Sequence, residues 1–174
     1  MNELFTFFWK GPFSQWHHSK FTVDGITYSH AEQFMMAGKA RLFNDTETLA
    51  KILATSNPRD QKKLGREVKN FDADLWDEHK FSIVYIGTYH KFTQNPDLKK
   101  ELLATGETTM VEASPVDRIW GIGLAEDDIR AGYRNEWRGD NYLGRVLDAV
   151  RARIRAEMFS FPTQKTGVND GLPF

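Results

Sequence analysis

The chain has 174 residues, enough for one domain with a hydrophobic core and too few for two. Its 23 basic and 24 acidic residues give a formal charge of -1, which argues against an extended nucleic-acid surface. The absence of cysteine excludes disulfides and thiolate chemistry. The start lacks the features of a signal peptide, and no apolar run approaches the roughly 20 residues that span a bilayer. We therefore expect a cytoplasmic protein with no membrane partner.

The first half of the chain predicts a hairpin followed by three helices. Residues 21–28 hold two β-prone runs around an Asp-Gly dipeptide, which is typical of a tight hairpin turn. Residues 29–32 have the S-x-x-E form of a capping box and predict a helix that runs to about Leu42. Two shorter helices are expected over residues 47–54 and, from an Asn-Pro start, over residues 57–68.

The second half predicts three more helices and a strand. Asp72 is a candidate N-cap for a buried helix that runs to about Phe92, because apolar residues occupy several of its faces. A short helix from Asn95-Pro96 to near Gly106 precedes a strand over residues 108–113. Asp140 or Asn141 opens the last helix. Four of its arginines lie mostly off the apolar face and are expected in solvent: Arg145, Arg151, Arg153 and Arg155.

These elements predict a mainly helical α+β fold with a small β-sheet or hairpin. One domain is expected over residues 1–159. Residues 160–174 contain prolines, glycines and polar residues with little to pack, so they predict a mobile or loosely docked tail.

Two segments near the C-terminus combine tryptophan and glycine with polar residues. Residues 117–124 read D-R-I-W-G-I-G-L, and residues 137–144 read W-R-G-D-N-Y-L-G. A tryptophan beside glycine offers a stacking surface next to backbone that a ligand can approach. Arginine and asparagine add donors for phosphate, ribose or a heterocycle edge. The combination favours a small nucleotide-like ligand, although the glycines do not form a dinucleotide fingerprint.

Short motifs spread over residues 8–155 occur in the order and spacing of a known family. They include Gly11-Pro12-Phe13-Ser14, Glu32-Gln33-Phe34-Met35, Lys39-Ala40, Leu64-Gly65-Arg66, Lys91-Phe92, Val111-Glu112-Ala113-Ser114, Trp120-Gly121-Ile122-Gly123-Leu124 and Trp137-Arg138-Gly139. On these residues the chain resembles the NADAR superfamily, also called the YbiA-like family. Gln15-Trp16 departs from the pattern, since many relatives carry Asn-Phe there.

The resemblance implies a mainly α fold with a small sheet and a pocket for ribosylated or ADP-ribosylated compounds. It implies hydrolysis of N-glycosidic bonds with no metal and no cofactor. One branch resembles enzymes that act on ribosylamino-pyrimidine phosphate intermediates of riboflavin biosynthesis, and another resembles enzymes that remove ADP-ribose from guanine bases. A third hypothesis is a non-catalytic module that binds ADP-ribose or an NAD derivative. The oligomeric state is not predicted.

Three residues are candidates for catalysis. Glu32 could stabilise an oxocarbenium-like sugar or activate water, or it could only cap its own helix. Lys39 falls on the same helix face about 10 Å further along, with Met36 between them as an apolar floor. Its amine could form a Schiff base at C1′ or hold a phosphate, and a plain surface lysine is the alternative. Asp117 could bind ribose hydroxyls or orient water, or it could cap a turn.

The candidates for substrate binding come mostly from the tryptophan–glycine segments. Trp120 and Trp137 could stack on a base, or they could be half-buried core residues. A phosphate is expected before the last helix, at its free backbone N–H groups. The full set of candidates is Phe13, Ser14, Met36, Trp120, Gly121, Trp137, Arg138, Gly139 and Asn141. Glu112 matches the family motif, yet it could equally be a strand residue that pairs with an arginine such as Arg118. The histidine spacing indicates no metal site.

Overall fold

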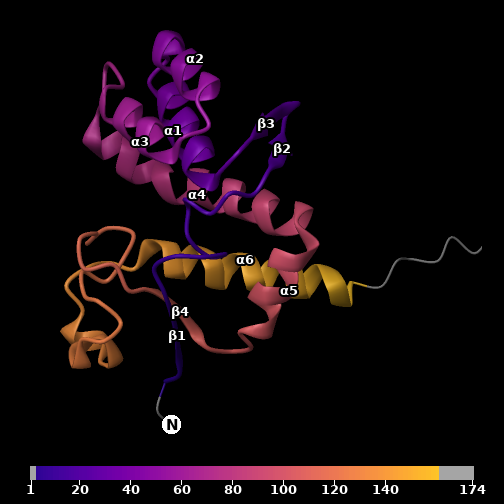
Figure 1. The fold of residues 1–174 in the computed structure, drawn as a ribbon, viewed down its shortest axis with the longest axis vertical. Helices are drawn as coiled ribbons and strands as arrows, with labels where there is room; N and C mark the ends of the chain where they lie inside the picture. Colours follow the sequence, from indigo (N-terminus) through magenta and orange to yellow (C-terminus); the bar gives the residue numbers. More distant parts are fainter. Residues whose placement is uncertain (1–2, 161–174) are drawn as a thin grey trace, which may run out of the picture.

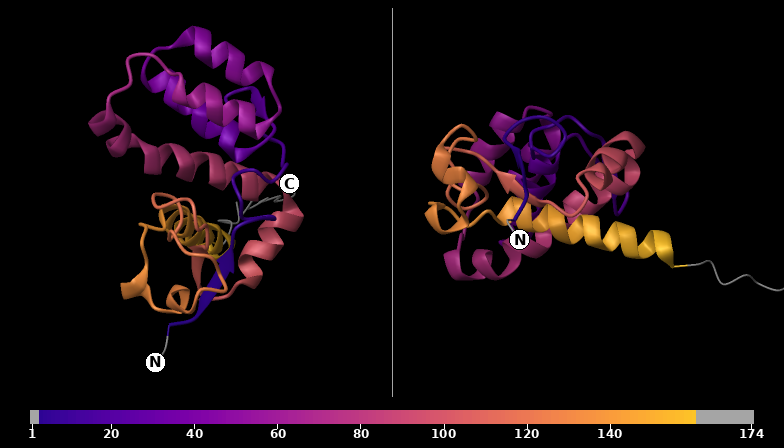
Figure 2. Two further views of the ribbon diagram at one scale, coloured as in Figure 1. Left: turned by 60° about the vertical axis from the view of Figure 1, so that its left-hand side comes forward. Right: turned by 90° about the horizontal axis from the view of Figure 1, so that it is seen from below.

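A long helix, α4 (Ala73–Gln94), crosses the middle of the molecule in the computed structural model, which describes residues 3–160 (Figure 1). On one side it contacts α1 (Ala31–Leu42), which also packs against α2 (Thr46–Ala54) and α3 (Pro58–Arg66). On the other side α4 contacts α6 (Tyr142–Phe159). The views in Figure 2 show these two helical groups on opposite sides of α4.

Two small sheets flank the helices. Strand β1 (Phe5–Phe8) pairs in parallel with β4 (Thr109–Glu112), and Phe8 lies opposite Glu112. Strands β2 (Phe21–Val23) and β3 (Ile26–Tyr28) form the antiparallel hairpin. Helix α5 (Pro96–Ala104) leads from α4 into β4, and β4 packs against α6.

The structure confirms the mainly helical α+β fold and the elements expected along the chain. Helix boundaries differ by a few residues, and two short 3-10 turns, η1 (Ile129–Gly132) and η2 (Arg134–Glu136), join β4 to α6. Strand β1 was not predicted, because its pairing partner lies about 100 residues further along the chain. The tail expected over residues 160–174 lies, after Ser160, outside the described residues. In the part that is described, no helix is both long enough and apolar enough to cross a membrane.

The capping box predicted at residues 29–32 is wrong. Helix α1 begins at Ala31, and the N-cap residue His30 forms no side-chain cap. The side chain that returns to Ser29 is that of Gln33, whose Oε1 accepts from the backbone N–H at 2.8 Å. Glu32 therefore does not cap the helix, although the motif suggested that it would.

The expectation of a solvated Arg151 is also wrong. The residue is 6% exposed, and its side chain donates to Thr105 Oγ1 at 2.6 Å and to the Thr108 carbonyl at 2.7 Å. It also pairs with Asp148 at 2.7 Å. These contacts tie α6 to the segment before β4, a tertiary arrangement that helical periodicity alone does not report.

A buried asparagine joins β4 to the start of α6. Asn141 adopts a left-handed backbone conformation with φ of 53°. Its Nδ2 donates to the Met110 carbonyl at 2.9 Å, and its Oδ1 accepts from the Glu112 N–H at 2.9 Å. Gly144 allows this close approach, since an added Cβ would lie 2.1 Å from the Met110 carbonyl oxygen. The end of β4 is thereby held in a defined position.

We expect Gly144→Ala to lower the free energy of unfolding by about 3 kcal/mol, because the new methyl group collides with backbone rather than with a flexible side chain. Urea unfolding monitored by circular dichroism measures this loss. Gly132→Ala is the matched control, since an added Cβ there meets nothing within 4 Å. Equal stability of the two variants would contradict the close packing of α6 on β4.

Candidate active site

Glu32 lies in the first turn of α1 with its carboxyl group turned into the protein. The residue is 4% exposed, and Oε1 has no hydrogen-bond partner within the described residues. Burial raises the pKa of Glu32 to about 7, although nearby Lys62 and Trp16 lower it and Asp117 raises it further. A buried carboxyl group with an unpaired oxygen is costly for stability, which is typical of a functional group.

A second buried carboxyl group belongs to Glu112 at the end of β4. Its Oε2 is buried and has no partner in the described structure. Burial raises the pKa of Glu112 to about 8; the charges of Asp117 and Glu32 raise it further, and that of Lys62 lowers it. No ion pair joins Glu112 to Arg118 within residues 3–160. Because the charge of Glu32 raises the pKa of Glu112, and that of Asp117 raises the pKa of both, the three residues form one acidic cluster.

Asp117 caps a turn, one of the two roles that its sequence position allowed; its binding of ribose hydroxyls or orientation of water stays a prediction. Its Oδ1 accepts from the backbone N–H groups of Ile119 at 2.9 Å and Trp120 at 2.8 Å, so it caps a turn. Its charge also raises the pKa of Glu32 and of Glu112. The turn thus holds a third carboxylate beside the buried pair.

Helix α3 brings basic groups to the acidic cluster. Lys62 lies with its Nζ 5.8 Å from the centre of the Trp16 ring, and Trp16 is 40% exposed. Lys62 and Arg66 are four residues apart, hence on one face of the helix, and both charges lower the pKa of Glu32. Neither forms an ion pair within the described residues. Sequence reasoning did not single out Lys62, although it precedes the Leu64-Gly65-Arg66 motif.

Lys39 has an aromatic environment. Its Nζ lies 4.2 Å from the centre of the Phe71 ring and 5.6 Å from that of Trp76, and burial lowers the pKa of Lys39. Met36, expected as the floor of an open pocket, is instead packed against α3, where an added Cβ at Gly65 would lie 1.8 Å from its sulfur. The charges that act most strongly on Glu32 do not include Lys39.

The two candidate tryptophans differ in their surroundings. Trp137 donates its indole N–H to the Ala131 carbonyl at 2.8 Å, and its ring lies 5.5 Å from that of Phe5. These contacts match the core interpretation of Trp137. Trp120 is half-buried beside the Asp117 turn, with its ring 6.1 Å from that of Tyr142. Trp120 is therefore the nearer of the two to the acidic cluster along the chain.

The segment before α6 builds a wall of the site from its backbone. An added Cβ at Gly121 would lie 2.8 Å from the Glu112 carbonyl oxygen, and one at Gly139 would lie 2.3 Å from that of Gly121. The amide of Asn141 is already paired at both ends, so the expected ligand role does not fit its geometry. Arg138 is exposed, and within residues 3–160 it bonds only through its backbone N–H, which donates to the Ile122 carbonyl.

Phe13 and Ser14 support the loop that carries Trp16. The Phe13 ring packs between those of Phe8 and Phe92, at 5.7 and 6.2 Å. Ser14 Oγ accepts from the Trp16 N–H at 3.2 Å. Both residues thus shape the turn; the substrate contacts expected of them stay a prediction.

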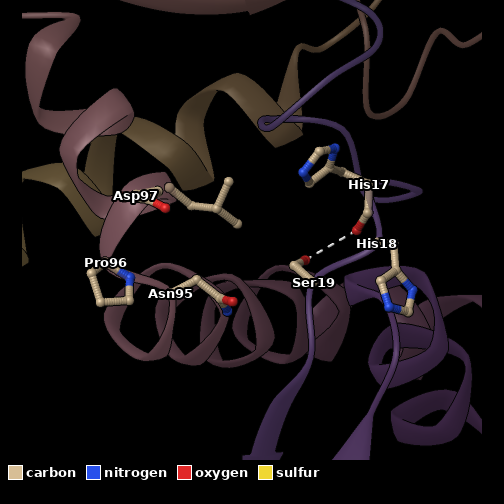
Figure 3. A pocket seen from close by; sticks show the side chains of 7 residues that line it. His17, His18, Ser19, Asn95, Pro96 and Asp97 are labelled. Atoms are coloured by element: carbon tan, nitrogen blue, oxygen red, sulfur yellow. Dashed lines mark hydrogen bonds between the residues drawn. The ribbon is translucent and has the colours of Figure 1, made fainter.

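Two surface hollows lie apart from the acidic cluster. One, of about 240 Å³, separates the 17–19 segment from the start of α5, and Figure 3 shows His17 across it from Asp97. The other, of about 230 Å³, lies between the hairpin and the end of α2. Neither is lined by Glu32 or Glu112. We place the candidate site at the buried acids, because perturbed titratable groups point to chemistry more directly than open volume does. No group of three potential ligands suited to a metal ion occurs in residues 3–160.

A family model described as the NADAR domain matches residues 7–155. The chain belongs to this family. It is 49% identical over 144 residues to N-glycosidase R617 of Acanthamoeba polyphaga mimivirus, a match that covers 80% of this chain and 85% of the relative. The NADAR fold is also supported by the NMR structure of the E. coli protein YbiA, with a TM-score of 0.77 at 24% identity, covering 95% of this chain and 93% of that one.

A more distant NADAR relative is larger than this chain. It is the riboflavin biosynthesis protein VVA0006 of Vibrio vulnificus, 28% identical over 145 residues. The match covers 83% of this chain but 36% of the relative. The shared region is therefore about a third of that protein.

We expect Glu112→Gln to stabilise the protein at high pH. Between the ordinary value of 4.5 and the raised pKa of about 8, folded Glu112 retains a proton that the unfolded chain releases, so its contribution to stability falls as pH rises. Glutamine removes this penalty. The gain in unfolding free energy should grow by about 4 kcal/mol between pH 5 and pH 9 in urea titrations.

The exposed acid Glu126 supplies the control, because Glu126→Gln should change stability equally at both pH values. A gain for Glu112→Gln that does not depend on pH would show that the carboxyl group is not held in its neutral form.

Proposed function

We propose that this protein is an N-glycosidase that hydrolyses the bond between ribose and a nitrogen base in a small phosphorylated compound such as a ribosylamino-pyrimidine phosphate. The observation that carries the proposal is the pair of buried acids, Glu32 and Glu112, each with an unpaired oxygen. The names of the relatives, N-glycosidase and riboflavin biosynthesis protein, support the reaction and this substrate class.

The two acids suit the two proton transfers of N-glycoside hydrolysis. With a pKa raised to about 8, Glu112 keeps a proton at neutral pH and can donate it to the leaving nitrogen. With a pKa of about 7, Glu32 is partly ionised, so it can stabilise the oxocarbenium-like sugar and take a proton from the attacking water. Water oxygen then bonds to C1′. Asp117 helps to keep the acid pair from losing both protons.

The unpaired atoms at the site are oxygens. Besides Glu32 Oε1 and Glu112 Oε2, the buried Gln15 Oε1 lacks a partner within the described residues. Gln15 adjoins the site, since its carbonyl accepts from the Glu32 N–H at 3.1 Å. A ligand that satisfies these oxygens must present donors, together with an acceptor for the proton that Glu112 retains. Ribose hydroxyl groups can both donate and accept.

The remaining groups suit the other parts of such a substrate. Lys62 and Arg66 are cations without acidic partners in the described structure, and we assign them the phosphate. The exposed ring of Trp16 offers the base a stacking surface beside Glu32, and Trp120 offers a second one beside Asp117. Burial lowers the pKa of Lys39, and its role as an amine that attacks C1′ or holds a phosphate remains a hypothesis. Metal independence also remains a prediction.

The charge of α3 favours one other candidate substrate. Arg59 and Lys63 are exposed on the same helix as Lys62 and Arg66, so several phosphates could be bound together. ADP-ribosylated guanine in a nucleic acid has this character, and removing its ADP-ribose needs the same acid chemistry. A guanine displaced from its strand would require only a small site.

We expect purified wild-type protein to release ribose phosphate from a ribosylamino-pyrimidine phosphate, detected by mass spectrometry. Glu32→Gln should lower kcat at least about 100-fold, because general acid–base groups contribute on that scale. Glu126→Gln should retain wild-type turnover. An ADP-ribosylated guanine oligonucleotide, run in parallel, distinguishes the two substrate classes.

Turnover of neither compound, together with measurable ADP-ribose binding, would favour the non-catalytic module. Full activity of a folded Glu32→Gln variant would refute the role of Glu32.

We expect Lys62→Met to raise KM for the phosphorylated substrate at least about 10-fold, the loss of one charge-assisted hydrogen bond. KM for the dephosphorylated compound should change much less, because the lost partner is absent from it. Steady-state kinetics on both compounds measure the difference, with Lys100→Met on the exposed face of α5 as control. An equal rise in KM for both compounds would show that Lys62 does not bind the phosphate.

A further inference from the structure

Helix α4 contains a buried lysine that the proposed chemistry does not use. Lys91 is 1% exposed, and its Nζ donates to the Ser14 carbonyl at 2.8 Å. It has no acidic partner within residues 3–160, and burial lowers the pKa of Lys91 to about 7. An apolar side chain of similar length would avoid the cost of burying this amine. The presence of a lysine at this position, bonded to Ser14, is therefore not explained by overall stability.

The Ser14 carbonyl is the anchor of the turn that reaches the active site. It also accepts from the His17 N–H at 3.2 Å, while Ser14 Oγ accepts from the Trp16 N–H at 3.2 Å. The next residue, Gln15, accepts from the Glu32 N–H at 3.1 Å. One amine from α4 thus fixes the peptide that presents Gln15 and Trp16 to Glu32.

On its far side this segment borders a hollow, and its packing includes the His18 ring against that of His30, with centroids 5.2 Å apart. Figure 3 shows the 17–19 stretch bordering the open hollow of about 240 Å³, with Asn95 and Asp97 on the opposite wall. The stretch is joined to the hairpin by one backbone bond, from the Ser19 N–H to the Ser29 carbonyl at 3.0 Å. The bond from Lys91 therefore restrains the turn from the interior side.

We propose that Lys91 is a positioning residue for the active site: through the Ser14 carbonyl it holds residues 14–17 against the start of α1, so that Gln15 and Trp16 close over Glu32. The effect on turnover rests on the proposed function. The effect on the turn does not.

Hydrogen–deuterium exchange with residue resolution tests the positioning directly. In Lys91→Met, the amides of His17 and Glu32, which bond to this turn, should exchange at least 10-fold faster than in wild type. The melting temperature should be unchanged or higher, because a buried amine has been replaced by an apolar group. A merely structural lysine would instead lower the melting temperature and leave these two amides no more affected than the rest of α4.

Lys80→Met is the matched control. Lys80 is also buried on α4, but its Nζ pairs with Asp77 at 2.7 Å and lies 4.9 Å from the Tyr142 ring centre. Its loss should leave the amides of His17 and Glu32 protected. Equal protection of these amides in Lys91→Met and Lys80→Met would overturn the proposal.

The absence of cysteine permits a chemical rescue. Lys91→Cys introduces a unique thiol, which can be alkylated with 2-bromoethylamine in the unfolded chain to restore an amine at nearly the original reach. After refolding, the alkylated chain should regain protection of the His17 and Glu32 amides, and the unmodified chain should not. Wild-type protection in the unmodified chain, or none in the alkylated one, would overturn the proposal.

Turnover of the ribosylamino-pyrimidine phosphate supplies the second readout. A misplaced turn should lower kcat at least 10-fold, with KM changed less, and alkylation of Lys91→Cys should recover the rate. If wild-type protein turns over no substrate, the proposed function fails while the exchange data still decide the role of Lys91. If turnover is robust and Lys91→Met retains the wild-type kcat, the link from Lys91 to catalysis is refuted.

Discussion

The burial of ionisable groups beside one another is the constraint on which this structure depends. Glu32 and Glu112 come from different elements, α1 and β4, yet the charge of Glu32 raises the pKa of Glu112, and Asp117 raises the pKa of both. In water both groups would ionise near pH 4.5, and the interior moves them towards neutrality because it solvates charge poorly. The same cost applies to Lys91. Burying these groups destabilises the folded protein, and the packing around them offsets that cost.

That packing explains why so many glycines and amides surround the acids. Asn141 holds the end of β4 through Met110 and Glu112, and Gly144 permits the approach. Gly121 brings its backbone against the Glu112 carbonyl, and Gly139 packs in turn against the backbone of Gly121. These residues carry the family motif without offering free ligand groups. Their role is to place Glu112 and Asp117, whereas α3 supplies the cations Lys62 and Arg66.

Sequence reasoning located the elements well and the site in part. Hairpin turns, N-caps and helical periodicity are local signals, so they predicted the hairpin, the six helices and β4 within the described chain. Glu32 and Asp117 were also singled out, although local motifs offered a capping role for each. The structure overturns that role for Glu32 and retains it for Asp117. Lys62 and Lys91 were missed as site residues. The position of a lysine in its helix does not show which residues of other segments it contacts.

The sequence by itself determined the family, the fold class and the residue types available for catalysis. These follow from patterns whose members lie within a few turns of one another, or from the order of motifs along the chain. Only the tertiary structure decided which groups act together. Strand β1 pairs across about 100 residues, and Glu32 meets Glu112, Asp117 and Lys62 from four separate segments. Burial and electrostatic coupling depend on distances between elements in space. The residue pattern along one helix or strand does not predict those distances.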